Sequence, residues 1–177
     1  MGYLLVLGGA RSGKSRLAER LARQAGTPVT FIATATEGDS EMADRIARHR
    51  SGRPADWSTV EAPLELHAAI SSAPESNFLI VDCLTLWVSN LMGAGQTGPT
   101  ILGLAAEVAR VLALRRGVVV TNEVGLGIVP ANELARAYRD VLGAVNVAFA
   151  DCAESSLLMV AGRALELGAA GPLLDLP

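Results

Sequence analysis

Several kinds of residue are scarce in this sequence, and each scarcity narrows what the chain can be. Aromatic residues make up 4% of its 177 residues, so its core must be aliphatic. No apolar run reaches the roughly 18 residues that span a bilayer. The two cysteines, Cys83 and Cys152, lie far apart and form no metal-binding pattern. We therefore expect reduced thiols and a single cytoplasmic domain over residues 1–177, with no leader or membrane segment.

Cationic residues are also few, and nearly all of them are of one type. The net charge is −3 and the estimated pI is about 5.4, which excludes the basic surface of a nucleic-acid-binding protein. Fourteen of the fifteen cationic residues are arginine, and the single lysine is Lys14. A lone lysine in an arginine-using sequence indicates a site that needs a compact ammonium group.

Short apolar runs alternate with amphipathic segments along the chain. The apolar runs predict strands at Tyr3–Leu7, Val29–Ala33, Phe78–Val81, Val118–Thr121 and Leu157–Val160. Helical spacing of apolar residues predicts helices at Arg16–Ala25, Glu41–Arg50, Pro63–Ser71, Leu84–Met92, Ile101–Leu114 and Ala131–Ala153. Loops are predicted at Gly93–Pro99, Asn122–Pro130 and the irregular tail Gly168–Pro177. This alternation predicts an α/β fold with a mostly parallel sheet and helices on both faces.

A phosphate-binding loop follows the first predicted strand. The motif G-x-x-x-x-G-K-[ST] is matched by Gly8, Gly9, Ala10, Arg11, Ser12, Gly13, Lys14 and Ser15. Its glycines allow successive N–H groups to point inward, and the following helix N-terminus favours phosphate oxygens. Lys14 is then expected to contact the β- and γ-phosphates, and the Ser15 hydroxyl to ligate Mg²⁺. The sequence therefore predicts a P-loop protein that binds a nucleoside triphosphate.

An acidic partner for Mg²⁺ is expected at the end of a later strand. Asp82 follows Phe78–Val81 and is the first candidate, and Glu123 follows Val118–Thr121 and is the second. Either residue can instead cap the helix that follows it. The loop Val124–Pro130 after Glu123 has two open interpretations, a segment that positions the acceptor or the metal, and a tight turn that needs glycine.

His49 lies near the end of a predicted helix beside Arg48, Arg50 and Arg53. A solvated basic helix end is one interpretation, because cations suit the C-terminal dipole. The other is a nucleophile, since the arginines would bind a polyphosphate and favour the neutral imidazole. The spacing alone leaves both open, and the only other histidine, His67, is expected on a helix surface.

Three sequence blocks together resemble a known family. They are GGARSGKS, then RI-x-x-H-x-x-x-RP-x-x-W-x-T-x-E, and then TNEVGLGIVP, and they occur in this order along nearly the whole chain. In these blocks the sequence resembles the bifunctional adenosylcobinamide kinase and adenosylcobinamide-phosphate guanylyltransferase of cobalamin biosynthesis.

The resemblance implies a RecA-like P-loop fold, a homotrimer and two reactions. A nucleoside triphosphate, ATP or GTP, phosphorylates the aminopropanol hydroxyl of adenosylcobinamide. GTP then transfers GMP through a histidine, by position His49, to give adenosylcobinamide-GDP. Beyond Gly8–Ser15, the implied nucleotide contacts are Thr34, Ala35, Thr36, Arg50, Ser51, Gly52, Arg53, Glu61 and Asp82, and the implied Mg²⁺ ligands are Ser15 and Asp82.

Two other functions compete with this one. A small nucleoside or nucleotide kinase would carry an arginine-rich lid, and no clear lid segment is present. A nucleotide-switched interaction protein of the GTPase kind would need an N-K-x-D motif. The single lysine lies in the phosphate loop, so that motif is impossible here.

Overall fold

The computed structural model describes residues 2–36 and 54–171. The predicted helix Glu41–Arg50 lies outside these residues. The strands are β1 (Tyr3–Gly8), β2 (Val29–Ala33), β3 (Ser58–Glu61), β4 (Phe78–Asp82), β5 (Gly117–Val120), β6 (Ser155–Val160) and β7 (Arg163–Leu167). The helices are α1 (Lys14–Gln24), α3 (Leu66–Ser72), α4 (Leu84–Gly93), α5 (Gly98–Leu112) and α6 (Glu133–Cys152).

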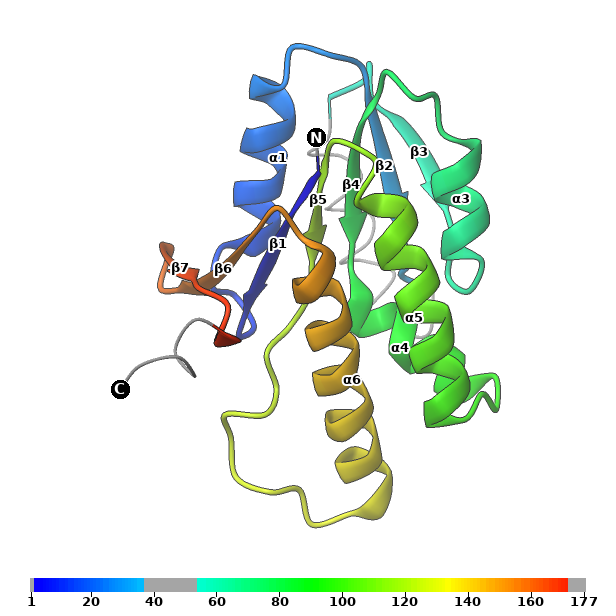
Figure 1. Cartoon of the computed structure of the whole chain (residues 1–177), viewed down its shortest axis with the longest axis vertical. Helices are drawn as coiled ribbons and strands as arrows, with labels where there is room; N and C mark the ends of the chain where they lie inside the picture. Colours follow the sequence, from blue (N-terminus) through cyan, green and yellow to red (C-terminus); the bar gives the residue numbers. More distant parts are fainter. Residues whose placement is uncertain (1, 37–53, 172–177) are drawn as a thin grey trace.

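The strands form one seven-stranded sheet in the order β3-β2-β4-β5-β1-β6-β7. Every neighbouring pair is parallel except β6 and β7. The carboxyl ends of the parallel strands therefore share one edge of the sheet, which faces downward in Figure 1. Ligands of open α/β sheets bind outside this edge.

Helices cover both faces of the sheet, as predicted, but unequally (Figure 1). In the part of the chain that the structure describes, α1 packs on one face, where its Ala18 and Ala22 belong to the same buried apolar cluster as Phe31 and Ile80. Helices α3, α4, α5 and α6 pack on the other face around the buried indole of Trp87. Because both faces are covered, the central strands are uniformly apolar, and this property made them recognisable.

Two strands were not predicted from the sequence. The strand β3 has the polar sequence Ser-Thr-Val-Glu at the sheet edge, where burial imposes no apolar run. The strand β7 is wholly exposed and pairs antiparallel with β6. A two-residue turn joins them, with Ala161 at φ 50° and Gly162 at φ 74°, the positive angles typical of a tight hairpin.

Several predicted boundaries were displaced. The predicted loop Gly93–Pro99 is shorter, because α4 ends at Gly93 and α5 begins at Gly98. Helix α5 begins early because the Thr97 hydroxyl accepts a hydrogen bond from the Thr100 N–H and proline is tolerated in a first turn. The helix predicted from Pro63 begins at Leu66. Among the described helices, none is both long and apolar enough to cross a bilayer.

Candidate active site

The phosphate loop has the conformation its sequence predicts. Gly8 ends β1, α1 begins at Lys14, and positive φ angles occur at Gly8 (149°), Arg11 (58°) and Gly13 (103°). A Cβ atom at Gly8 would lie 2.4 Å from the Met159 carbonyl oxygen. Glycine is therefore required at position 8 by both backbone angle and space.

The loop is held from two sides by backbone hydrogen bonds. The Gly162 N–H of the β6–β7 turn donates to the Ser12 carbonyl at 2.9 Å. From the other side, the Glu123 N–H donates to the Gly8 carbonyl at 3.1 Å. The unpredicted hairpin thus supports the loop directly, and the segment after β5 forms the opposite wall.

Lys14 lies buried over this loop. Its side-chain ammonium donates to the Gly8 carbonyl at 2.9 Å and to the Gly9 carbonyl at 2.7 Å, and the residue is 7% exposed. The Ser12 hydroxyl is also buried and has no hydrogen-bond partner among the described residues. A cation and a polar hydroxyl therefore lie within a loop whose Gly9, Ala10 and Arg11 are open to solvent. This combination suits an anionic ligand.

Asp82 ends β4, and β5 lies between β4 and the phosphate-loop strand β1. Thr34, Ala35 and Thr36 follow β2, and Glu61 ends β3 in register with Ala33. The structure therefore gathers these predicted contacts and Gly8–Ser15 at one edge of the sheet. The predicted contacts Arg50, Ser51, Gly52 and Arg53 and the predicted nucleophile His49 lie outside the described residues.

Thr34 is fully buried and ties β2 to β4. Its hydroxyl donates to the Cys83 carbonyl at 2.7 Å and accepts from the Cys83 N–H at 2.8 Å. Its own N–H donates to the Asp82 carbonyl at 3.2 Å. The only hydroxyl proton is thus engaged within the protein, and Thr34 fixes the turn that carries Asp82. A nucleotide contact from Thr34 stays a prediction.

The two cysteines are free and half-buried. Burial raises the pKa of the Cys83 thiol to about 11, and the nearby Asp82 carboxylate adds to the rise. A neutral thiol is a weak nucleophile. We therefore treat Cys83 as a structural residue beside the site.

A polar network behind the site fixes the segment after β5. The buried Asn146 of α6 accepts a hydrogen bond from the Thr121 hydroxyl at 2.7 Å and donates to the Asn122 carbonyl at 3.0 Å. The Asn122 N–H donates to the Thr85 hydroxyl at 2.7 Å, and the Tyr138 hydroxyl donates to the Thr85 carbonyl at 3.0 Å. Burial raises the pKa of Tyr138 to about 12, so it remains a donor at neutral pH.

No sequence pattern points to Asn146, because it lies in the middle of a helix as an isolated polar residue. His67, by contrast, is exposed on α3 as predicted.

Trp57, which belongs to the second sequence block, is half-buried against the α1 side of the sheet. The Arg23 guanidinium lies 5.6 Å from its ring centroid, so this block is anchored to α1 just before β3.

Sequence comparison decides which P-loop family this is. A family model described as "Cobinamide kinase / cobinamide phosphate guanyltransferase" matches residues 4–167. The chain belongs to this family. It is 47% identical over 171 residues to the bifunctional adenosylcobalamin biosynthesis protein CobP of Pseudomonas aeruginosa, covering 92% of this chain and 95% of that protein. It is 42% identical over 180 residues to the CobU protein of Salmonella typhimurium, covering 93% and 98%.

The resemblance drawn from the three sequence blocks is thereby confirmed. The chain is an enzyme, a bifunctional cobinamide kinase and cobinamide phosphate guanylyltransferase of cobalamin biosynthesis. A kinase without guanylyl transfer is not favoured.

Solved structures confirm the fold. The RadB recombinase superposes with a TM-score of 0.52 at 16% identity, covering 89% of this chain and 73% of that one. The flagellar accessory protein FlaH from Methanocaldococcus jannaschii superposes with a TM-score of 0.52 at 15% identity, covering 94% and 77%. At such identities the likeness shows the RecA-like P-loop fold alone.

Proposed function

We propose that Gly8–Ser15 binds the triphosphate of ATP or GTP for both reactions of this cytoplasmic enzyme. The observation that carries the proposal is the buried Lys14 ammonium over a glycine loop that opens into α1, in a chain of this family. In the kinase step, the aminopropanol hydroxyl oxygen of adenosylcobinamide attacks the γ-phosphorus and the bond to the β-phosphate oxygen breaks. Positioning and charge neutralisation carry such a transfer.

Ser15 and Asp82 are the proposed Mg²⁺ ligands. Within residues 2–36 and 54–171, no three His, Cys, Asp or Glu residues gather as a metal cluster. Mg²⁺ needs no such cluster, because it is usually held by one or two carboxylates together with substrate phosphates. A hydroxyl at the start of α1 and a carboxylate at the end of β4 fit that donor set. When bound, the ion would neutralise phosphate charge.

His49 is the proposed nucleophile of the guanylyl transfer. Its imidazole nitrogen attacks the α-phosphorus of GTP, the α–β bond breaks and pyrophosphate leaves. A phosphate oxygen of the cobinamide phosphate then attacks the same phosphorus and the P–N bond breaks. Covalent catalysis thus divides one displacement into two. The support is the position of His49 in the second sequence block, whose last residue, Glu61, lies at the carboxyl edge of the sheet.

Labelling the protein with α-³²P GTP and Mg²⁺ tests this assignment. We expect an acid-labile, base-stable label that is absent from His49→Ala and from Lys14→Ala. His67→Ala is the matched control, because His67 is exposed on α3 outside the second block, and it should label normally. His49→Ala should still phosphorylate adenosylcobinamide, whereas Lys14→Ala should do neither. Equal loss of both activities in folded His49→Ala would contradict the nucleophile role.

One nucleotide site and a homotrimer complete the proposal. A single glycine phosphate loop occurs in the 177 residues, and a second independent GTP site in a binding titration would contradict a shared site. Among the described residues, no strand pairs with the outer side of β7. Leu165 on β7 and Val160 at the end of β6 are each 62% exposed. Exposed apolar edges favour association. Light scattering that gave a monomer mass would refute the trimer.

A further inference from the structure

The segment between β5 and α6 begins beside the phosphate loop, where the Glu123 N–H donates to the Gly8 carbonyl, and exposes apolar side chains further along. Leu126 is 83% exposed, Ile128 is 98% exposed and Val129 is 61% exposed. In Figure 1 this segment leaves the end of β5 and projects beyond the carboxyl edge of the sheet before entering α6. A cluster of exposed apolar side chains on a segment that starts at a reaction centre is suited to binding a bulky apolar ligand.

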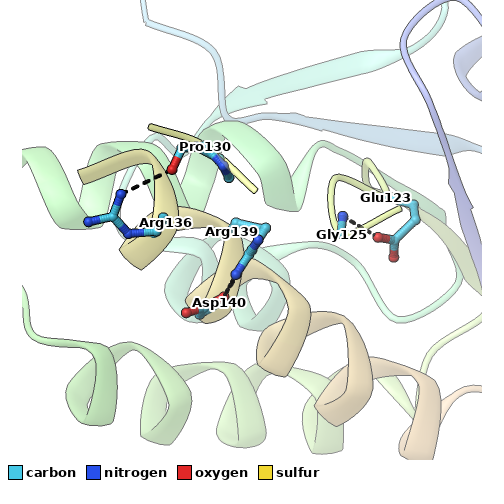
Figure 2. A network of polar contacts seen from close by, with 6 residues as sticks. All are labelled: Glu123, Gly125, Pro130, Arg136, Arg139 and Asp140. Carbon is cyan, nitrogen blue, oxygen red and sulfur yellow. Dashed lines mark hydrogen bonds and ion pairs between the residues drawn. The ribbon is translucent and has the colours of Figure 1, made fainter. Parts of the chain in front are cut away.

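Hydrogen bonds hold both ends of this segment in place. At its start, the Glu123 N–H donates to the Gly8 carbonyl, and the Gly125 N–H donates to the Glu123 carboxylate. At its end, the Arg136 guanidinium donates to the Pro130 carbonyl at 3.0 Å (Figure 2). The exposed apolar residues therefore lie on a loop with fixed ends, which suits ligand binding because less ordering is required.

The strand order places Glu123 in the middle of the nucleotide site. It follows β5, which lies between the phosphate-loop strand and the strand that ends in Asp82. Its N–H and the Lys14 ammonium both donate to the Gly8 carbonyl. Two ordinary hydrogen bonds meeting at one oxygen keep those nitrogens within about 6 Å of each other. The Glu123 side chain therefore starts beside the lysine expected to contact the γ-phosphate.

Only one carboxylate oxygen of Glu123, Oε1, accepts the hydrogen bond from Gly125. A carboxylate has about four acceptor sites, so this contact orients the group and leaves capacity for a substrate hydroxyl. The residue is half-buried, which gives a ligand access to it.

We propose that Glu123 binds the acceptor hydroxyl and accepts its proton in the kinase step, while Leu126, Ile128 and Val129 contact the apolar body of the corrinoid. This rests on the proposed nucleotide site. As the hydroxyl oxygen bonds to the γ-phosphorus, the O–H proton passes to the Glu123 carboxylate, and the leaving β-phosphate oxygen stays on the nucleoside diphosphate. Glu123 then releases the proton to solvent.

The catalytic part is tested with Glu123→Gln, which keeps the shape and removes the basic oxygen. We expect kcat for cobinamide phosphorylation to fall on the order of 100-fold or more, while the dissociation constant for the triphosphate changes by less than about threefold. Glu133→Gln, an exposed carboxylate at the start of α6, is the matched control and should behave as wild type. Normal phosphorylation by Glu123→Gln would overturn the base assignment.

Gly125→Ala provides a second variant that keeps the carboxylate. A Cβ at Gly125 would lie 2.9 Å from the Glu123 Oε1 atom and displace it, whereas a Cβ at Gly127 would meet no atom within 4 Å. Gly125→Ala should therefore lower kcat more than Gly127→Ala does. Equal rates in the two variants would show that the carboxylate position does not matter.

The binding part is tested with the double variant Leu126→Ser/Ile128→Ser. Its KM for adenosylcobinamide should rise on the order of 10-fold, with an unchanged KM for the triphosphate. Leu114→Ser is the matched control, because Leu114 is 78% exposed and precedes β5, at the opposite edge of the sheet. An unchanged KM for adenosylcobinamide would refute the proposal.

The oligomeric state of the double variant distinguishes the corrinoid from the alternative occupant of this loop, a second copy of the chain. Suppose that light scattering gives a smaller mass for the double variant, while its KM for adenosylcobinamide is unchanged at protein concentrations where the oligomer is fully assembled. The loop would then bind a second copy of the chain, and the proposal would be overturned. Failure of the nucleotide site is distinguishable, because it would also abolish labelling of the wild-type protein by α-³²P GTP.

Discussion

The substitution Thr34→Val separates a structural role of Thr34 from direct nucleotide binding. Valine keeps the branched shape and removes the hydroxyl, so packing is nearly preserved. Two hydrogen bonds to the backbone of Cys83 are lost, at 2.7 and 2.8 Å. The Cys83 N–H and carbonyl then lack this partner at the turn that follows Asp82.

The expected cost follows from these two contacts. Each lost bond is worth about 1 kcal/mol, and each buried group left unsatisfied costs about 1–3 kcal/mol. Cys83 is half-buried, so water reaches part of this turn and each group left without its partner costs an amount near the lower end of that range. The total loss of unfolding free energy should therefore be about 2–4 kcal/mol. For a domain of this size Tm falls by about 2–4 °C per kcal/mol, which gives a decrease of roughly 5–15 °C.

Thermal and urea denaturation measure this change, and a nucleotide titration at a temperature where both proteins are folded measures binding. Thr59→Val is the control, because Thr59 is exposed on β3 and its Tm should change little. We expect Thr34→Val to lose stability and to keep its triphosphate affinity within about threefold. A large loss of affinity without a change in Tm would refute the reasoning and indicate that the hydroxyl contacts the nucleotide.

Three further predictions concern residues around the site. Gly8→Ala should destabilise the fold by about 2 kcal/mol or more and abolish triphosphate binding in a titration, because its Cβ would lie 2.4 Å from the Met159 carbonyl. Asn146→Ala should cost about 1–3 kcal/mol in urea denaturation, since the buried Thr121 hydroxyl loses its acceptor, and should lower kcat more than it raises KM for the triphosphate. The pKa of Cys83 is raised from 9.0 to about 11, so folding favours the neutral thiol. The stability that the neutral thiol contributes is full below pH 9 and is lost as pH rises through 11. The dependence of the unfolding free energy on pH should therefore weaken in Cys83→Ala.

Much of the site could be predicted because its chemistry depends on local sequence. The phosphate loop needs glycine at Gly8 and Gly13 and a lysine at Lys14, and these needs leave a contiguous pattern. Buried parallel strands likewise leave apolar runs. Edge strands leave weaker signals, and for this reason β3 and β7 were missed.

Residues that support the site from a distance leave no such pattern. Asn146 is 24 residues from the Asn122 carbonyl that it binds, and Gly162 donates to Ser12 from the far end of the chain. Each interaction exists only because the sheet brings separate segments together. No short window of sequence contains both partners.

The sequence by itself determined the phosphate loop, the α/β class and the family, since each rests on short patterns of neighbouring residues that can be read one after another along the chain. Only the tertiary structure decided that the β6–β7 hairpin supports that loop, that Thr34 is engaged with Cys83, and that Glu123 stands beside Lys14. The physical reason is the strand order, which places β5 and β6 on either side of β1. That order depends on how the whole hydrophobic core packs.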